Sequence, residues 1–162
     1  MGTFSKSFAS LGGFIATNKE ITNYLRHHSR SYIFTASITP ASTAAALKAL
    51  DLMIEEPERQ ANLWKLTHMA LEGFRQAGFE IGNTSTPIIP LFVRDNFKTF
   101  AITSDLLKEG IFVNPVVSPA VAPHDTLIRF SLMATHTPEQ VAEALEKITK
   151  VFRKHGILPT NN

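Results

Sequence analysis

Apolar positions recur at helical spacing through the first half of the chain. Residues 18–28 carry a stripe at i, i+3, i+4 and i+7, which predicts a helix after a short strand at 12–17. Residues 42–76 are predicted to be mostly helical, with Pro57 marking either a break or a fresh first turn and Gly78 marking the end. The apolar faces consist of Ile21, Tyr24, Leu25, His28, Leu47, Leu50, Ile54, Leu63, Leu66, Ala70 and Phe74.

From residue 87 onward the pattern predicts strands and helices in turn. Strands are expected at 87–95, 111–117 and 126–134, and a helix at 97–109 is expected to stop at Gly110. Pro90 indicates that the first of these strands lies at an edge or carries a bulge. Thr137, Pro138 and Gln140 predict the N-cap, first position and capping box of a last helix. Its apolar stripe is formed by Val141, Leu145, Ile148 and Phe152.

This order of elements predicts an α+β fold, in which helices cover one face of a small, antiparallel-rich sheet. We expect three parts: the tail of a larger sheet domain over residues 1–40, a helical connection over 41–78 and a small α+β domain over 79–162. The last boundary is placed where the long helical pattern gives way to strands and helices in alternation.

Composition narrows the classes of function. The 162 residues are 44% hydrophobic and 19% charged, with a net charge of +2 and no basic run, so a nucleic-acid partner is not expected. Mild basicity suits an anionic small molecule such as a CoA thioester. The chain has no cysteine, so disulfides and thiolate chemistry are excluded and cytoplasm is the default compartment. No leader peptide or membrane-spanning segment is expected.

Several familiar sites lack their sequence signatures. Six histidines show no metal-ligand spacing with carboxylates, so no metal site is expected, and His136, beside Thr137 at a helix start, is interpreted as structural. A Gly-x-Ser-x-Gly elbow and the glycine spacing of a P-loop are both absent from the sequence.

Lys6 lies among hydroxyl and glycine residues in MGTFSKSFASLGG. Hydroxyls can bind a phosphate, glycines let backbone approach it, and an amine held close to a carbonyl can act as a nucleophile. A Ser/Gly-rich chain start is also typical of a frayed terminus. The flanking residues of interest are Gly2, Thr3, Ser5, Ser7, Ser10, Gly12 and Gly13.

Arg129 is the second candidate, since strand alternation places it opposite the apolar Ile128 and Phe130. It is either a solvated arginine or a guanidinium that binds a carboxylate through two parallel hydrogen bonds. Thr35 and Ser37 are hydroxyls near a turn, and local capping of the following helix would explain them equally well.

Four ordered blocks resemble the α-oxoamine synthases, the pyridoxal-phosphate enzymes of the serine palmitoyltransferase, 8-amino-7-oxononanoate synthase and 2-amino-3-ketobutyrate CoA ligase family. They are GTFSKSFASLGG, RSYIFTASITP at 30–40, GIFVNPVVSPAV at 110–121 and LIRFSLMATHTPEQV at 127–141. The resemblance implies the C-terminal part of a fold type I enzyme, with residues 1–40 as a remnant of the large cofactor domain. The family's ring-stacking histidine and pyridinium-pairing aspartate lie before this lysine and cannot be assigned.

The resemblance also implies the chemistry. Lys6 would attach pyridoxal 5′-phosphate covalently and transfer protons, and Thr3 would help to bind its phosphate. Thr35 and Ser37 would reach the phosphate of a neighbouring subunit, which implies a homo-oligomer. Arg129 would bind the carboxylate of the amino-acid substrate. The implied reaction is decarboxylative condensation of serine, glycine or alanine with an acyl-CoA, and the isolated chain is expected to be inactive.

A second hypothesis belongs to another class of function. The chain would be a non-catalytic folding or interaction module that has kept an inherited lysine loop. The reading frame upstream of Met1 separates the two, because a continuous frame encoding the missing half supports an enzyme.

Overall fold

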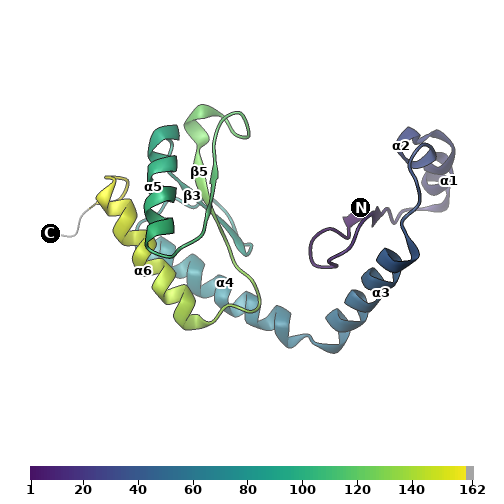
Figure 1. Ribbon diagram of the computed structural model, residues 1–162, viewed down its shortest axis with the longest axis horizontal. Coiled ribbons are helices and arrows are strands. Elements are labelled where there is room, and N and C mark those ends of the chain that lie inside the picture. The colour runs from purple at the N-terminus through teal and green to yellow at the C-terminus, as the bar shows by residue number, and fades with distance from the viewer. Residues whose placement is uncertain (160–162) are drawn as a thin grey trace. The chain divides into compact units, whose positions relative to one another are not determined.

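The computed structural model describes residues 1–159, which form two compact units (Figure 1). The first comprises Met1–Pro57, and the second begins at Glu58. The long helical region is therefore shared, with one helix in each unit. The three-part division expected from the sequence stays a prediction.

The first unit contains a two-stranded antiparallel ribbon and three helices. Strands β1 (Gly2–Thr3) and β2 (Gly13–Phe14) are followed by helices α1 (Lys19–His28), α2 (Arg30–Ile33) and α3 (Pro40–Glu55). Asn18 caps α1 by accepting a hydrogen bond from the Ile21 N–H, as expected for an N-cap side chain. Of the strand expected at 12–17, only Gly13–Phe14 is confirmed, as β2.

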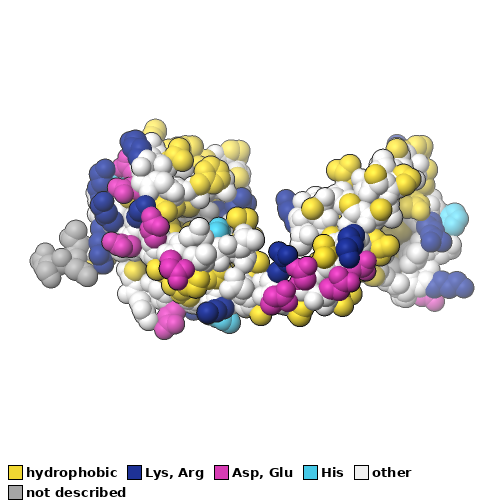
Figure 2. Space-filling model, turned by 60° about the horizontal axis from the view of Figure 1, so that its bottom comes forward, with side chains coloured by type: hydrophobic (Ala, Val, Ile, Leu, Met, Phe, Trp, Pro, Cys, Tyr) yellow, Lys and Arg dark blue, Asp and Glu magenta, His cyan; other side chains and the backbone are white. Residues whose placement is uncertain are grey.

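The apolar faces expected on α1 and α3 are largely exposed in the described chain. Tyr24 is 61% exposed, and Leu47 and Ile54 are 61% and 71% exposed. Figure 2 shows hydrophobic side chains on the surface of both units. Periodicity thus predicted the helices correctly, whereas the contacts that bury these faces are absent from the described residues.

The second unit is built on a three-stranded antiparallel sheet. Its strands are β3 (Ile88–Phe92), β4 (Asn114–Val116) and β5 (Leu127–Ser131), in the order β3–β5–β4. Pro90 lies on the edge strand β3, so the expected edge position is confirmed. All three strands are shorter than the pattern predicted.

One face of the sheet is buried against helices α4 (Glu58–Gln76), α5 (Asn96–Lys108) and α6 (Pro138–Lys154). Ile89 and Phe130 are paired across β3 and β5, as are Leu91 and Ile128, and all four side chains are buried. On α4, Phe74 packs edge-on against Phe130 with ring centroids 5.2 Å apart. The α+β architecture expected from the sequence is confirmed.

Helix ends in this unit follow the local signals. The capping box of α6 is present, with Thr137 accepting from the Gln140 N–H and the Gln140 side chain accepting from the Thr137 N–H. Gly78 and Gly110 follow α4 and α5 with φ of +85° and +82°, a conformation that glycine adopts readily. No helix within residues 1–159 has the length and apolar character needed to cross a membrane.

An ion cluster joins α5 to the end of α6. The Asp105 carboxylate accepts hydrogen bonds from Lys154 Nζ at 2.8 Å, Lys108 Nζ at 3.0 Å and His155 Nε2 at 3.0 Å. Hydrogen bonding to the Lys154 ammonium, followed by that to Lys108, holds the pKa of the Asp105 carboxyl well below its usual range. The charged form is thus favoured in the folded chain.

This shift predicts the pH dependence of the second unit. Because the folded pKa of Asp105 lies below the unfolded value of about 3.9, its stabilisation is present above pH 4 and is lost as pH falls further. We expect Asp105→Asn to lower the urea midpoint at pH 7, and this difference from wild type to shrink at pH 3. Fluorescence of Trp64, on α4, reports the unfolding of this unit.

Asp51→Asn is the matched control, because Asp51 is an exposed carboxylate on α3 in the first unit. It should leave the midpoint unchanged at both pH values. An Asp105→Asn difference of equal size at pH 3 and pH 7 would contradict the assignment.

Candidate functional site

Lys6 lies in a closed loop between β1 and β2. The Phe4 N–H donates to Gly12 O, and the Ser10 N–H donates to Phe4 O, each at 2.9 Å. Within the loop, the Ala9 N–H donates to Lys6 O at 2.9 Å. The backbone is therefore fixed on both sides of Lys6, and the frayed terminus considered from the sequence is not what these residues form.

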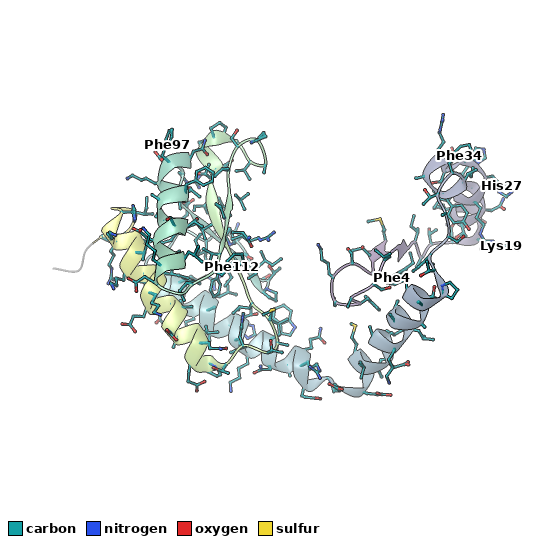
Figure 3. The ribbon with its side chains drawn as sticks, viewed as in Figure 1. Phe4, Lys19, His27, Phe34, Phe97 and Phe112 are labelled. Carbon is teal, nitrogen blue, oxygen red and sulfur yellow. The ribbon has the colours of Figure 1, made fainter. Side chains whose placement is uncertain are left out.

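Side chains anchor the same loop to the rest of the first unit. The Phe4 ring packs edge-on against Phe8, with centroids 5.2 Å apart, and lies 5.6 Å from the Phe14 ring. Ser10 Oγ donates to Ser42 O on α3 at 2.6 Å. Figure 3 labels Phe4 within this loop. The loop is held by an aromatic cluster and by one long-range hydrogen bond.

The groups presented by the loop suit a phosphorylated aldehyde such as pyridoxal phosphate. Lys6 is exposed and its side chain makes no hydrogen bond or ion pair with the described residues, so its amine is available for a covalent bond. Thr3 Oγ1 lies 3.0 Å from Ser5 Oγ, and both hydroxyls are exposed. Hydroxyls of this kind can donate to phosphate oxygens. The donor set therefore fits the cofactor that the resemblance implies.

Thr35 and Ser37 lie on the connection between α2 and α3 and are exposed. The side chain that caps α3 is Thr39, which accepts from the Ser42 N–H. Local capping therefore does not explain Thr35 or Ser37, and that alternative is wrong. Their hydroxyls are available on the surface of the first unit.

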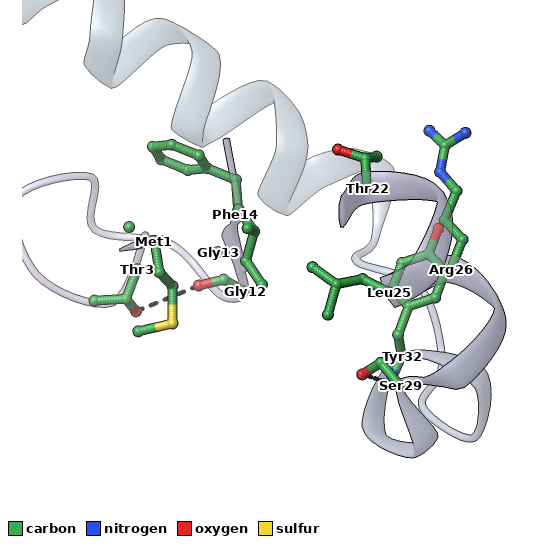
Figure 4. Close-up of a pocket in the computed structure, with 12 residues that line it drawn as sticks. Met1, Thr3, Gly12, Gly13, Phe14, Thr22, Leu25, Arg26, Ser29 and Tyr32 are labelled. Atoms are coloured by element: carbon green, nitrogen blue, oxygen red, sulfur yellow. Dashed lines mark hydrogen bonds between the residues drawn. The ribbon is translucent and has the colours of Figure 1, made fainter. Parts of the chain in front are cut away.

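A cavity of about 550 Å³ opens beside β1 and β2 (Figure 4). Thr3, Gly13 and Phe14 line one side of it, and α1 and α2 line the other with Leu25 and Tyr32. Lys6 is not among the lining residues, and neither are Thr35 and Ser37. The cavity is thus not a site assembled around the lysine, and Thr3 is the one candidate that it includes.

Arg129 lies at the centre of β5, on the open face of the sheet. Its Nη2 donates to Asn114 Oδ1 on β4 at 3.1 Å, and the residue is exposed. Arg129 also lines a second cavity of about 550 Å³, together with Phe112, Asn114 and Ser131. Figure 3 shows Phe112 projecting from the segment before β4, where it is 80% exposed.

The candidates therefore fall in two groups. Lys6, Thr3, Thr35 and Ser37 belong to the first unit, whereas Arg129 belongs to the second. Sequence reasoning missed Asn114, the partner of Arg129. No local signal could have found it, because the two residues are 15 positions apart and meet only through the register of β4 and β5.

Comparison with known proteins gives consistent matches. The model of the family described as aminotransferase class I and II matches residues 1–148. The serine palmitoyltransferase of Bacteroides thetaiotaomicron is 59% identical over 158 residues, which cover 98% of this chain and 40% of that relative. The 8-amino-7-oxononanoate synthase of Thermosipho melanesiensis is 37% identical over 158 residues, with the same coverage.

Solved structures agree with these matches. The Sphingomonas wittichii serine palmitoyltransferase gives a TM-score of 0.86 at 33% identity and covers 98% of this chain and 40% of its own. A high-resolution structure described as SPT with PLP gives 0.86 at 31% identity and covers 97% and 40%. The chain spans about 40% of the length of the relatives that it matches.

The close approach of β1 and β2 predicts which glycine the lysine loop needs. A Cβ at Gly13 would lie 2.5 Å from Gly2 O and 3.2 Å from the Thr3 Cα. Both are backbone atoms, so the clash could be relieved only by moving the strand. We expect Gly13→Ala to push strands β1 and β2 apart. Amide exchange of Phe4 and Ser10 should then become about tenfold faster, because one backbone hydrogen bond contributes about 0.5–1.5 kcal/mol.

Gly2→Ala is the matched control on the opposite strand. Its Cβ would meet only the end of the Phe14 ring, at 2.6 and 2.8 Å, and this half-exposed ring can turn aside. Exchange should change little. Equal effects of the two substitutions would show that backbone crowding does not hold the loop.

Proposed function

Because the chain belongs to the aminotransferase class I and II family, we propose that it forms part of a pyridoxal-phosphate-dependent acyltransferase. The resemblance to the α-oxoamine synthases is confirmed by the relatives, which are serine palmitoyltransferases and 8-amino-7-oxononanoate synthases. The observation that carries the proposal is the unengaged amine of Lys6 on a loop fixed at both ends.

The proposed reaction joins an amino acid to an acyl-CoA. A bond forms between the α-carbon and the acyl carbon, the CoA thiol leaves, and the carboxyl group leaves as CO₂. Pyridoxal phosphate, when bound, draws electrons away from the α-carbon. Lys6 holds the cofactor through Nζ and, when released from it, carries a proton on the same atom. The Thr3 hydroxyl helps to bind the phosphate.

The remaining sequence candidates have binding roles in this proposal. The guanidinium of Arg129 orients the carboxylate of the amino acid through charge-assisted hydrogen bonds. The hydroxyls of Thr35 and Ser37 bind the phosphate held by a neighbouring copy of the chain, which makes the active protein a homo-oligomer. The exposed apolar faces of α1 and α3 support such association.

Serine and a long-chain acyl-CoA are the substrates we propose first, with glycine or alanine and a shorter acyl-CoA next. The 59% identity to a serine palmitoyltransferase, against 37% to an 8-amino-7-oxononanoate synthase, supports this order. Cytoplasmic location stays a prediction. We propose that turnover needs further parts of the cofactor site, since the relatives are more than twice as long as this chain.

The covalent role of Lys6 can be tested directly. In the full-length protein that carries this chain and the further parts of the cofactor site, borohydride reduction with cofactor bound, followed by peptide mass mapping, should place the cofactor on Lys6. Lys6→Ala should lose the label and reduce kcat by about 10²–10⁴-fold, the usual contribution of proton transfer.

Lys19→Ala serves as the control, because Lys19 is another exposed lysine of the first unit. It should keep both label and activity. Label on another lysine, or a Lys6→Ala variant with full activity, would rule out the proposed function.

The role of Arg129 predicts a selective loss of amino-acid binding. Arg129→Lys keeps the charge but removes the planar pair of donors. We expect KM for the amino acid to rise about 10–100-fold, as for loss of a charge-assisted hydrogen bond, while KM for the acyl-CoA stays the same. Steady-state kinetics of the full-length protein that carries this chain, with each substrate varied in turn, measures this. An unchanged KM for the amino acid would show that Arg129 does not bind its carboxylate.

A further inference from the structure

Strand β5 has partners on its β4 side at Arg129, which pairs with Asn114, and at Met133, whose N–H donates to His136. Ser131, which lies between them, has no strand partner on that side. Leu132 N donates to Pro87 O on the β3 side, so alternation turns the N–H of Arg129, Ser131 and Met133 toward the β4 side. Asn114, the first residue of β4, lies opposite Arg129, so no strand residue follows opposite Ser131. The gap lies in the second cavity, which Ser131 lines.

His136 closes this edge beyond Ser131. Its Nδ1 accepts a hydrogen bond from the Met133 N–H at 3.2 Å, so the imidazole takes the place of a strand partner. In a neutral imidazole one nitrogen accepts and the other donates, so Nε2 carries the proton. His136 lines the cavity that Arg129 also lines. The ring therefore offers one N–H donor that the turn does not use.

The turn that holds His136 is fixed from two sides. The His136 N–H donates to Met133 O at 3.2 Å, and Asn62 Nδ2 on α4 donates to Ala134 O at 2.7 Å. The capping box of α6 begins at the next residue, Thr137. Because the backbone is fixed on both sides, the position of the imidazole is set before any ligand binds.

The charges in the cavity favour an anion. Its lining contains one arginine, Arg129, and one carboxylate, Glu143. Glu143 Oε1 already pairs with Lys147 Nζ at 2.6 Å, one turn along α6. The unneutralised charge is therefore the guanidinium, and the neighbouring donors are the Ser131 N–H and His136 Nε2.

We propose that His136 is a substrate-binding residue, which donates from Nε2 to the carboxylate of the amino acid that Arg129 binds. The carboxylate lies opposite Ser131, in the gap between Asn114 and His136. Strand spacing of about 3.3 Å per residue places Arg129 and Met133 about 6.6 Å from Ser131 on either side, within reach of side chains that converge on one group. This inference rests on the proposed function.

Two substitutions separate the two nitrogens of His136. In His136→Asn, the amide oxygen can still accept from the Met133 N–H, but the donor at the Nε2 position is lost. In His136→Gln, the longer side chain restores a donor near that position but leaves the Met133 N–H without its acceptor. Both variants are made in the full-length protein that carries this chain and the further parts of the cofactor site, and its steady-state kinetics with cofactor bound and its thermal unfolding are measured.

We expect His136→Asn to raise KM for the amino acid about tenfold, as for one lost hydrogen bond to a charged group, with unchanged KM for the acyl-CoA and unchanged unfolding. His136→Gln should unfold at a lower temperature and keep KM for the amino acid near that of wild type. Nitrogen-15 NMR of histidine should find the proton of His136 on Nε2 and a shift of this nitrogen when the amino acid is added.

The outcomes separate this inference from the proposed function. If wild type condenses the substrates and Arg129→Lys raises KM while His136→Asn does not, the role of His136 is overturned and the function stands. A proton on Nδ1, or an effect on the acyl-CoA alone, also overturns the role of His136. A cofactor-loaded full-length protein, which carries this chain together with the further parts of the cofactor site, overturns both if it fails to condense any amino acid with any acyl-CoA.

Discussion

Strand β5 lies between β3 and β4, so its side chains cannot change face without breaking two ladders at once. Ile128 and Phe130 are buried beneath the helices, and this burial holds Arg129 and Ser131 on the open face. Each fully buried apolar side chain contributes about 1.5–3 kcal/mol, whereas a typical hydrogen bond contributes about 0.5–1.5 kcal/mol net. Core packing therefore sets the position of Arg129, and its contact with Asn114 only refines it.

The first unit depends on a different constraint, the closure of a short loop. The ribbon of β1 and β2 has only two residues in each strand, so it needs additional contacts to be stable. The ring of Phe4 and the hydrogen bond from Ser10 to α3 provide them. Lys6 is therefore exposed on a loop whose backbone is held on both sides, as the proposed covalent attachment of a cofactor would require.

Charged side chains add contacts between elements that also pack in the apolar core. Arg94, which has a φ of +64°, pairs with Glu80 and with Asp125, and hydrogen bonding to Arg94 lowers the pKa of the Glu80 carboxyl. This cluster ties the end of β3 to the 3₁₀ turn at Pro123–Asp125, just before β5. Asp105 does the same between α5 and α6. Both clusters join residues that are distant in the sequence.

Local patterns in the sequence determined the helices, the capping box of α6 and the outward direction of Arg129, because each depends on residues a few positions apart. Pro90 indicated an edge or a bulge, and the strand order of the sheet decided for the edge. The cluster of hydroxyls around Lys6 was also visible in the sequence. Only the tertiary structure decided that Asn114 meets Arg129, that Asn62 holds the turn at Ala134, and that His136 faces the same cavity as Arg129. These contacts join segments that strand register and helix packing bring together, and no periodicity along the chain encodes such a meeting.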